Sequence, residues 1–208
     1  NSLSPIASIS QTLNRLLSRQ NENLESQNDD IKQDLREGLS IIGERANGLS
    51  QFVNSYKQLA KLPEPQKHRV SIIELVNKTC ALFDSHIIKL ESTIDVELLL
   101  DPVQFEQVLI NLLKNSVEAM AKSSSKAFIS ISWDTTKSFF QLKICDQGGG
   151  INNPENLFVP FYSTKKQGSG IGLVLCRQIV EAHNGRLSLT NRLNTQGCCA
   201  VIEIPFSH

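Results

Sequence analysis

Several residue types are scarce in this chain of 208 residues. Aromatic residues make up only 6% of it, which argues weakly against stacking surfaces for single-stranded nucleic acid. The 21 Lys and Arg residues are balanced by 21 Asp and Glu residues, so a protein that wraps duplex nucleic acid is not expected. No apolar run approaches the roughly 20 residues of a membrane span, and no signal peptide opens the sequence. We expect a globular chain of one large or two small domains.

The cysteines show neither the number nor the spacing that is typical of a disulfide-rich domain or a zinc site. The five cysteines are odd in number and none is spaced as CxxC: Cys80, Cys145, Cys176, Cys198 and Cys199. This pattern predicts neither a disulfide framework nor a zinc site. We therefore expect all five to be reduced thiols of a cytoplasmic domain.

The first 61 residues have the pattern of an antiparallel helical hairpin. Apolar or small residues recur at steps that alternate between four and three, at Leu35, Leu39, Ile42, Ala46, Leu49, Val53, Tyr56 and Ala60. One helix cannot bury such a narrow heptad stripe alone. A shorter helical pattern covers residues 3–17, and the polar residues 18–23 suit the connection. The stripe predicts a homodimeric bundle through residues 1–61, and a hairpin packed on its own domain is the alternative.

The pattern changes after residue 61. Two prolines within residues 62–65 cannot continue a helix, and residues 62–69 are expected to form a linker. A capping box at 71–74 opens a predicted helix to about residue 83, and Asp101-Pro102 opens another to about residue 121. Strands are predicted at 94–99, 128–133, 139–145, 186–191 and 198–205, with a third helix at 171–182. Residues 70–208 are thus expected to form an α+β domain, with helices on one face of a mostly antiparallel sheet.

The helix predicted from Pro102 carries an unusual polar stripe. Asn111, Asn115 and Glu118 lie at positions i, i+4 and i+7, on one side of the helix. Asn is unfavourable inside a helix because its amide competes for backbone hydrogen bonds. An amide oxygen is a hard neutral ligand that suits Mg²⁺. The alternative is that both asparagines are simply solvated.

A carboxylate followed by glycines comes directly after a predicted strand. In Asp146-Gln-Gly-Gly-Gly150 the glycines permit positive φ and a close approach of a flat or charged ligand to the backbone. The Asp146 carboxylate can accept a hydrogen bond from an exocyclic amine. The alternative is a glycine turn in which Asp146 is the turn residue.

A second glycine-rich stretch leads into the third predicted helix. Residues 165–173 read KKQGSGIGL, so two lysines precede a turn that opens a helix. Free backbone N–H groups and the helix dipole there form a site for an anion. The order of residues fits neither a Walker A loop nor a dinucleotide-binding fingerprint.

Four stretches, taken in order, resemble the motifs of the sensor histidine kinases. Residues 106–119 (EQVLINLLKNSVEA) look like the N box of that family, and residues 146–150 (DQGGG) look like its first glycine box. Residues 157–165 (LFVPFYSTK) look like the F box, and residues 168–173 (GSGIGL) look like the second glycine box. Each motif is modest alone, but the order and spacing are specific. The segment 52–65 also resembles the NtrY-like branch.

The resemblance implies a Bergerat-type α/β sandwich that binds ATP with Mg²⁺. It implies that Asn115 is the Mg²⁺ ligand, that Asp146 accepts the adenine amine, and that Asn111 and Lys165 are catalytic. The other nucleotide-binding positions it implies are Gly148, Gly150, Ile151, Gly168, Ser169, Gly170, Ile171, Gly172 and Leu173. In related ATPases that use water, Glu stands where this chain has Asn111. Its absence fits transfer to a protein imidazole.

The phospho-acceptor histidine of the family has no match in this sequence. Residues 1–5 (NSLSP) resemble the end of the family's H box, whose histidine would precede Asn1. His68, His86, His183 and His208 do not match it, and His183 is expected to be structural. We therefore expect a fragment that binds ATP without phosphorylating itself, from a parent protein anchored in the cell membrane.

The implied function is that of the cytoplasmic core of a sensor histidine kinase. Such a core transfers the γ-phosphoryl group of ATP to a histidine of the dimerisation helix, and then to an aspartate of a response-regulator receiver domain. Two alternatives with the same fold remain open, a serine kinase and a non-catalytic nucleotide-binding module. The heptad hairpin speaks against the first, and intact Asn115 and Asp146 speak against the second.

Overall fold

The structure is a computed structural model of the whole chain, and it describes residues 10–11, 14, 29–60, 62–121, 128–165 and 169–206. The chain divides into two compact units after Ala60. No helix in these described ranges is both long enough and apolar enough to cross a membrane.

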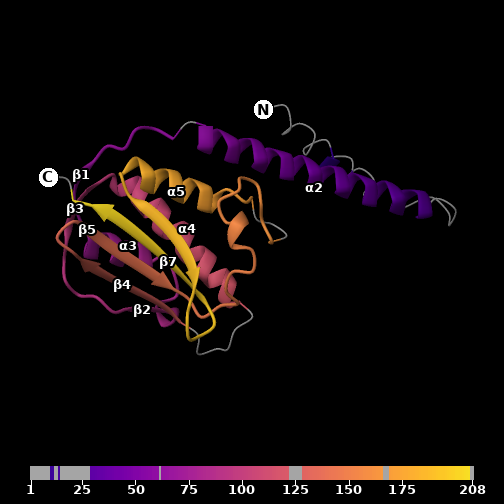
Figure 1. Cartoon of the computed structure of the whole chain (residues 1–208). Coiled ribbons are helices and arrows are strands. Elements are labelled where there is room, and N and C mark those ends of the chain that lie inside the picture. The colour runs from indigo at the N-terminus through magenta and orange to yellow at the C-terminus, as the bar shows by residue number, and fades with distance from the viewer. Residues whose placement is uncertain are drawn as a thin grey trace. The chain divides into compact units, whose positions relative to one another are not determined.

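The first unit contains one long helix, α2 (Asp29–Ala60) (Figure 1). It carries the whole predicted heptad stripe and ends before Pro63, as expected for a segment that proline stops. Within the stripe Ala46 is buried, whereas Ile42 and Leu49 each remain 48% exposed. These two apolar side chains of the stripe are therefore exposed in the described part of the chain, where they offer a surface to a partner helix.

Little of the predicted first arm of the hairpin falls within the described residues. Ser10 and Asn14 are helical, and the Ser10 hydroxyl donates a hydrogen bond to the carbonyl oxygen of Leu39 on α2. The predicted connection at 18–23 and most of residues 3–17 lie outside the described part of the chain. The antiparallel hairpin therefore stays a prediction.

The second unit contains a five-stranded sheet of order β2-β4-β5-β7-β6 (Figure 1). The strands are β2 (Ile88–Leu90), β4 (Ile129–Thr135), β5 (Phe139–Cys145), β6 (Arg186–Asn191) and β7 (Cys198–Pro205). Strand β2 pairs with β4 in parallel, and the other pairs are antiparallel. The predicted mostly antiparallel sheet is confirmed.

A separate pair of antiparallel strands stands beside the main sheet. It consists of β1 (His68–Ser71) and β3 (Glu97–Leu100). Strand β3 replaces the longer strand predicted at 94–99, and β1 includes the last two residues of the predicted linker. The sequence pattern predicts neither β1 nor β2, because strands of four and three residues are too short to show a period.

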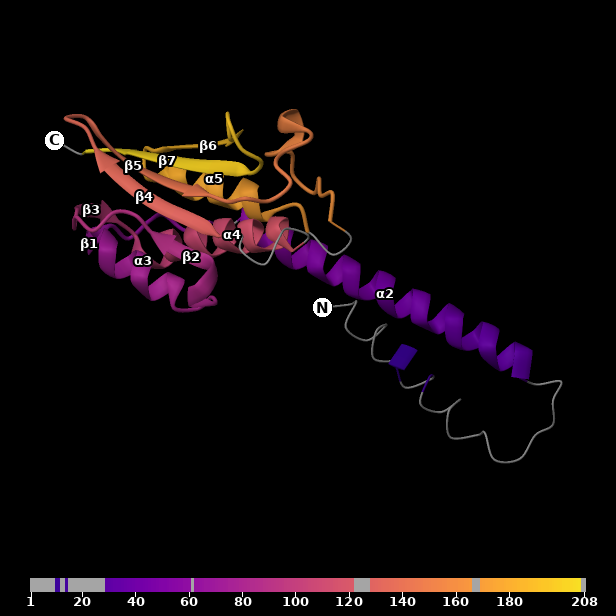
Figure 2. The same ribbon diagram turned by 90° about the horizontal axis from the view of Figure 1, so that it is seen from below.

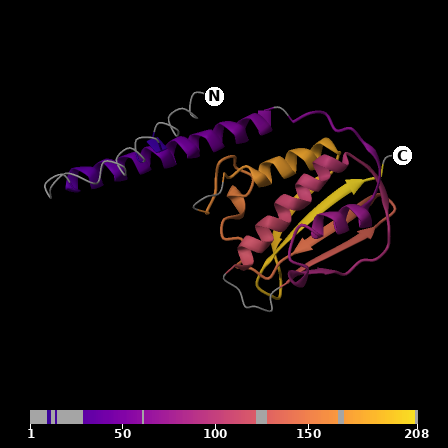
Figure 3. The ribbon, with the colours of Figure 1, turned by 180° about the vertical axis from the view of Figure 1, so that it is seen from behind.

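Three helices cover one face of the main sheet: α3 (Ile72–Cys80), α4 (Pro102–Met120) and α5 (Gly172–Ala182). Figure 2 shows the strands above this helical layer, and Figure 3 shows the layer from behind. Alternate residues of β5 are buried against it. The largest fully buried side chains are Phe105, Phe140, Ile72, Leu100, Leu113, Ile129, Ile131, Leu142, Ile144, Ile179, Ile202 and Val76. Short turns of 3₁₀ helix stand at Ser85–Ile87 and Pro154–Asn156.

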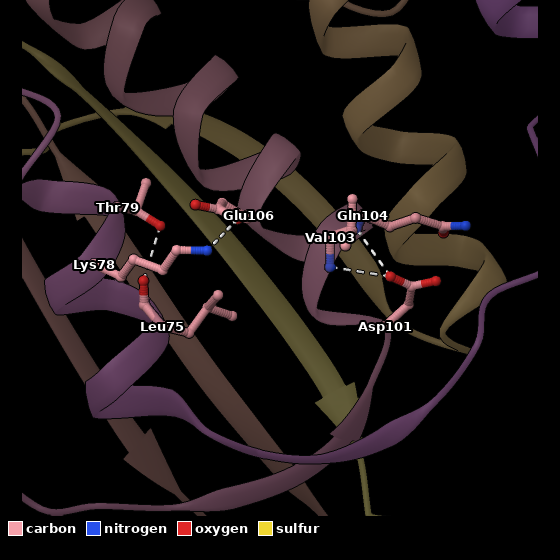
Figure 4. A network of polar contacts seen from close by, with 7 residues as sticks. All are labelled: Leu75, Lys78, Thr79, Asp101, Val103, Gln104 and Glu106. Atoms are coloured by element: carbon pink, nitrogen blue, oxygen red, sulfur yellow. Dashed lines mark hydrogen bonds and ion pairs between the residues drawn. The ribbon is translucent and has the colours of Figure 1, made fainter.

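Asp101 fixes the start of α4, as the sequence predicts (Figure 4). Its Oδ1 accepts hydrogen bonds from the backbone N–H groups of Val103 and Gln104, at 3.0 and 3.1 Å. Its Oδ2 accepts a third from the N–H of Gln66 at 2.9 Å. Burial opposes ionisation of this carboxyl group, but the three N–H donors hold its pKa below the usual value.

Two further polar contacts position α3. Ser71 caps α3 as predicted, because its hydroxyl accepts a hydrogen bond from the N–H of Glu74 at 3.2 Å, which is one of the two bonds of a capping box. Near the other end of α3, Lys78 Nζ lies 3.0 Å from Oε2 of Glu106 on α4 (Figure 4). The N-cap and the ion pair set the direction of α3 against α4, the helix that carries the polar stripe.

His183 joins the end of α5 to the start of α4 and is 3% exposed. Its Nε2 accepts a hydrogen bond from the N–H of Asp101 at 2.9 Å, and its Nδ1 lies 2.8 Å from the carbonyl oxygen of Ile179, to which it donates. One ring nitrogen accepts while the other donates, so the ring is neutral, and burial lowers its pKa. The predicted structural role is confirmed.

The prediction that all five cysteines are free thiols is wrong. Cys145 and Cys199 form a disulfide. They stand directly opposite each other in the register of β5 and β7, although 54 residues separate them in sequence. Cysteine spacing carries no signal of this pairing because the sheet register brings the two residues together. Cys80, Cys176 and Cys198 are free.

Candidate nucleotide-binding site

One side of α4 presents the predicted polar stripe. Asn111 and Asn115 are half-buried and Glu118 is exposed, whereas Val108, Leu109 and their apolar neighbours pack into the core. From Asn111 to Ala119 the helix rises by about 12 Å. This length is enough for separate loops to contact the stripe at successive turns.

The loop after β5 holds Asp146, which is 4% exposed. Its Oδ1 accepts hydrogen bonds from the backbone N–H groups of Gly148 and Cys198, at 2.9 and 3.1 Å. No described residue donates to Oδ2. Buried carboxylate oxygens are normally hydrogen-bonded, so Oδ2 is the atom with acceptor capacity left for a ligand.

Close packing of the loop explains two of its glycines. A Cβ on Gly148 would lie 2.7 Å from the carbonyl oxygen of Ala119, so this glycine lets the loop approach the last turn of α4. Gly150 has a φ of +78°, and a Cβ there would lie 2.9 Å from Oδ1 of Asn191. The protein's own packing therefore requires both glycines, and their contact with a base stays a prediction.

The start of α5 contacts the other end of the stripe. A Cβ on Gly172 would lie 3.5 Å from Oδ1 of Asn111, so the first turn of α5 lies against this side chain. The N-cap residue Ile171 makes no side-chain capping hydrogen bond. The first N–H groups of α5 are therefore not capped by their own N-cap side chain, which is the property that an anion site needs.

Gly170, just before α5, packs tightly on the segment that resembles the F box. Its φ is +66°, and a Cβ there would lie 2.5 Å from the carbonyl carbon of Phe161. The N–H of Phe161 donates to the carbonyl oxygen of Gly170 at 3.0 Å. Ser169, Ile171 and Leu173 lie in the same described segment, whereas Gly168 lies outside the described residues.

Lys165 reaches the middle of the stripe. Its Nζ lies 2.9 Å from Oδ1 of Asn115 and 2.5 Å from Oε2 of Glu118. The resemblance assigns roles to Lys165 and Asn115, and the structure brings them together across 50 residues of sequence. Glu118 has no assigned role in the resemblance, and only its place on the polar stripe could have pointed to it.

Three segments contact α4 at successive turns: the start of α5, the segment that ends at Lys165, and the Asp146 loop. The start of α5 contacts Asn111, Lys165 contacts Asn115 and Glu118, and Gly148 packs on Ala119. These positions are i, i+4, i+7 and i+8, so they share one side of the helix. A ligand along this side would meet the N–H groups of α5 at one end, the lysine in the middle, and the Asp146 loop at the other end.

Two contacts of the Asp146 loop are not predictable from local sequence. Asn191 ends β6, and its Oδ1 accepts a hydrogen bond from the N–H of Ile151 at 2.6 Å while its Nδ2 donates to the Ile151 carbonyl oxygen at 3.0 Å. The Cys198 backbone both donates to Asp146 and accepts from its N–H at 2.8 Å. Both contacts depend on the order of strands in the sheet, which no local pattern encodes.

The stripe suits a small hard cation. Among the described residues no three His, Cys, Asp or Glu side chains converge on a common metal position. The Asn115 amide oxygen and the Glu118 carboxylate nevertheless both contact the Lys165 ammonium, so this oxygen pair already holds a positive charge. Amide and carboxylate oxygens are ligands that Mg²⁺ takes together with phosphate oxygens and water.

Comparison with known proteins decides the family. The family model described as histidine kinase-, DNA gyrase B- and HSP90-like ATPase matches residues 100–208, just over half of the chain. The chain belongs to this family. Its residues 100–208 include the N box, both glycine boxes and the F box, so this ATPase domain contains the site described above.

Curated relatives narrow the assignment to the sensor histidine kinases. The chain is 32% identical over 178 residues to an NtrY-like sensor histidine kinase of Rickettsia bellii, covering 81% of this chain and 28% of the relative. It is 30% identical over 158 residues to the sensor protein FixL of Bradyrhizobium diazoefficiens, covering 72% of this chain and 31% of the relative. The chain therefore spans less than a third of these relatives. The predicted resemblance to sensor histidine kinases is confirmed.

Solved structures agree with this assignment. The catalytic domain of the histidine kinase ThkA is 29% identical, with a TM-score of 0.56, and covers 67% of this chain and 95% of that domain. ThkA in complex with its response regulator TrrA has a TM-score of 0.65 over 99% of this chain and 59% of ThkA. At 22% identity the second comparison shows the fold alone. The predicted α+β ATP-binding domain of a histidine kinase is confirmed.

Proposed function

We propose that this histidine kinase domain binds ATP with Mg²⁺ and transfers the γ-phosphoryl group to a histidine of a dimerisation helix. An aspartate of a response-regulator receiver domain then takes the phosphoryl group. The observation that supports this proposal is the convergence of three loops on one side of α4. An acceptor for an amine at one end and N–H groups at the other match the base and the phosphates of a nucleotide, and the lysine lies between them.

The adenine end lies at the Asp146 loop. Both hydrogen bonds to Oδ1 come from the protein backbone, so they hold the carboxylate in one orientation before ligand arrives. Oδ2 then accepts a hydrogen bond from the exocyclic amine of adenine. Gly148, Gly150 and Ile151 shape the loop around the base.

The phosphate end lies at the start of α5. Backbone N–H groups of residues 169–173 and the helix dipole favour the negative charge there, and Gly168, outside the described residues, belongs to the same motif. Lys165 moves from its ion pair with Glu118 to the phosphate oxygens. Asn115 holds Mg²⁺ with Glu118 nearby, and the ion, when bound, neutralises part of the phosphate charge.

Asn111 favours a protein acceptor over water. It lies beside the first turn of α5, where the terminal phosphate is expected. An amide cannot accept a proton from an attacking water as a carboxylate does. Phosphoryl transfer by positioning and charge stabilisation alone suits a nucleophile that needs no strong base, such as an imidazole.

Replacing Lys165 by alanine tests the phosphate end. We expect the affinity for ATP to fall by about tenfold, the effect of losing one charge-assisted hydrogen bond at a partly exposed position. The affinity for adenosine should not change, because adenosine has no phosphate. Competition with a fluorescent ATP analogue measures both. Lys114→Ala is the matched control, since Lys114 is an exposed lysine on α4. An equal loss for ATP and adenosine would contradict the assignment.

The remaining parts of the proposal concern the whole protein. We propose a homodimer through residues 1–61, supported by the exposed apolar residues of the heptad stripe on α2. The receiver-domain partner and a cytoplasmic position within a membrane-anchored parent are supported by the resemblance to sensor kinases. ThkA, which shares this fold, is seen with a response regulator.

A charge placed in the stripe tests the dimer. Leu49→Asp should weaken dimerisation by at least about tenfold, because an aspartate would be buried in an apolar interface. Light scattering at micromolar concentrations measures the mass of the unmodified chain and the variant. Asn47→Asp adds the same charge at an exposed position outside the stripe and should leave the mass unchanged. A monomeric unmodified chain at high micromolar concentration would overturn the dimer.

A further inference from the structure

We propose that Cys145 and Cys199 form a reversible dithiol–disulfide site whose state is coupled to nucleotide binding at Asp146. The inference rests on the proposed function, since it takes Asp146 as the residue that binds adenine. Three observations support it: the position of the two cysteines in the sheet, their access to solvent, and the hydrogen bonds between Asp146 and Cys198, which stand next to Cys145 and Cys199 in the chain.

The sheet holds the two cysteines directly opposite each other. Cys145 is the last residue of β5 and stands opposite Cys199 of β7, with their Cα atoms 4.0 Å apart and their sulfurs bonded. Along both strands the residues at alternate positions, such as Ile144 and Ala200, are buried beneath the helices. Cys145 and Cys199 therefore lie on the other face of the sheet, which α3, α4 and α5 leave uncovered (Figure 2).

Access to solvent distinguishes Cys145 and Cys199 from the buried free cysteine Cys176. Cys145 and Cys199 are both half-buried, so a small thiol or disulfide can reach them. Cys176 is fully buried, and burial raises its pKa to about 12. Burial and the nearby Asp146 charge raise the pKa of Cys198 to about 12 as well, so it remains a thiol. Cys198 also points to the opposite face from Cys199, its neighbour in the strand.

The chemistry is thiol–disulfide exchange with a low-molecular-weight disulfide as oxidant. The thiolate of one cysteine attacks a sulfur of the oxidant, forms a mixed disulfide and releases one thiolate. The second cysteine thiolate then attacks the protein sulfur of the mixed disulfide and releases the other. Two electrons pass from the protein to the oxidant, and the two protons lost by the cysteines end on the two released thiols. Excess thiol reverses both steps.

Asp146 is connected to Cys145 by the chain, and to Cys199 through the hydrogen bonds that it makes with the neighbouring residue Cys198. It follows Cys145 directly, and its N–H donates to the carbonyl oxygen of Cys198 at 2.8 Å. The N–H of Cys198, next to Cys199, donates to Oδ1 of Asp146 at 3.1 Å. The disulfide therefore joins the two strand ends within one residue of both hydrogen bonds. It holds the carboxylate in the orientation that leaves Oδ2 for the ligand.

The expected result is tighter binding by the oxidised chain. A fluorescent ATP analogue should bind the oxidised form at least about fivefold more tightly than the reduced form, the lower range of typical coupling between sites. Because coupling is reciprocal, the analogue should shift the thiol–disulfide equilibrium toward the disulfide by the same factor. The full 208-residue chain, equilibrated with set ratios of oxidised and reduced glutathione, serves for both measurements. Intact mass after alkylation counts the free thiols.

Cysteine variants test whether the redox dependence of analogue binding comes from Cys145 and Cys199. Cys145→Ser and Cys199→Ser should each bind the analogue with the affinity of the reduced chain at every glutathione ratio, and Cys145→Ala/Cys199→Ala does the same if serine disturbs the strands. Cys80→Ser, a change at a half-buried cysteine at the end of α3, should keep the full redox dependence. Equal affinity of the oxidised and reduced chains, or no disulfide under oxidising glutathione, would overturn the inference. Failure of both forms to bind the analogue would overturn the proposed function as well, while the thiol count would still report the disulfide.

Discussion

Replacing Asp146 by asparagine is expected to weaken the binding of an ATP analogue by about ten- to a hundredfold. Removal of a hydrogen-bond partner that is buried against a ligand costs about 1–3 kcal/mol. The substitution is selective, because the amide oxygen of D146N can still accept from the N–H groups of Gly148 and Cys198, so the loop keeps both contacts. What changes is Oδ2, which is replaced by an NH₂ donor facing the adenine amine.

Titration of the analogue into the unmodified chain and the variant, with circular dichroism to confirm the fold, measures this effect. Asp134→Asn is the matched control, because Asp134 is an exposed aspartate near the end of β4. It makes the same change of charge without altering the loop and should bind the analogue normally. Unchanged affinity of D146N would refute the adenine assignment, whatever the result at Lys165.

The second expected result is an absence of phosphohistidine. Incubation of the 208-residue chain with labelled ATP and Mg²⁺ should leave no acid-labile phosphate on it. Residues 1–61, which contain α2, have no histidine. His183 is buried with both ring nitrogens engaged, and the other described histidines, His68 and His86, lie on β1 and in a 3₁₀ turn. Phosphoryl transfer requires a nucleophile held in line, and positioning supplies most of its acceleration.

Binding of the ATP analogue by the same sample is the control, since it shows that the nucleotide site is intact when no label is transferred. Strong acid-labile labelling of the unmodified chain would contradict the prediction. His68→Ala would then be the first variant to make, because His68 is exposed and stands close to the end of α2 in sequence.

Local sequence signals were sufficient where a few adjacent residues decide the structure. Ser71 caps α3 through the N–H of Glu74, as the spacing predicts, and Asp101 caps α4 one residue before Pro102. The alternation of apolar residues predicted β5 and β7 within a residue of their observed limits. Short-range hydrogen bonds and side-chain period carry these features, so each is encoded within a single element.

The resemblance proposes the members of the candidate site but does not say how they contact one another. Asn111, Asn115, Lys165 and Gly172 belong to three separate motifs, and only packing on α4 brings them to one side of that helix. Glu118 and Asn191 become part of the site through contacts that span 47 and 40 residues. Such contacts depend on how the elements pack, which no window of sequence contains.

The sequence by itself determined the helices, the main strands of the sheet, the glycine-rich loops and the family. Only the tertiary structure decided the order of the loops along α4, the ion pair of Lys165 with Glu118, and the bond between Cys145 and Cys199. The physical reason is the distance in sequence over which each interaction acts. Caps, turns and periodic burial are set by neighbours in sequence, whereas the register of β5 against β7 is set by the whole sheet. That register places Cys199 opposite Cys145 and next to the Asp146 loop.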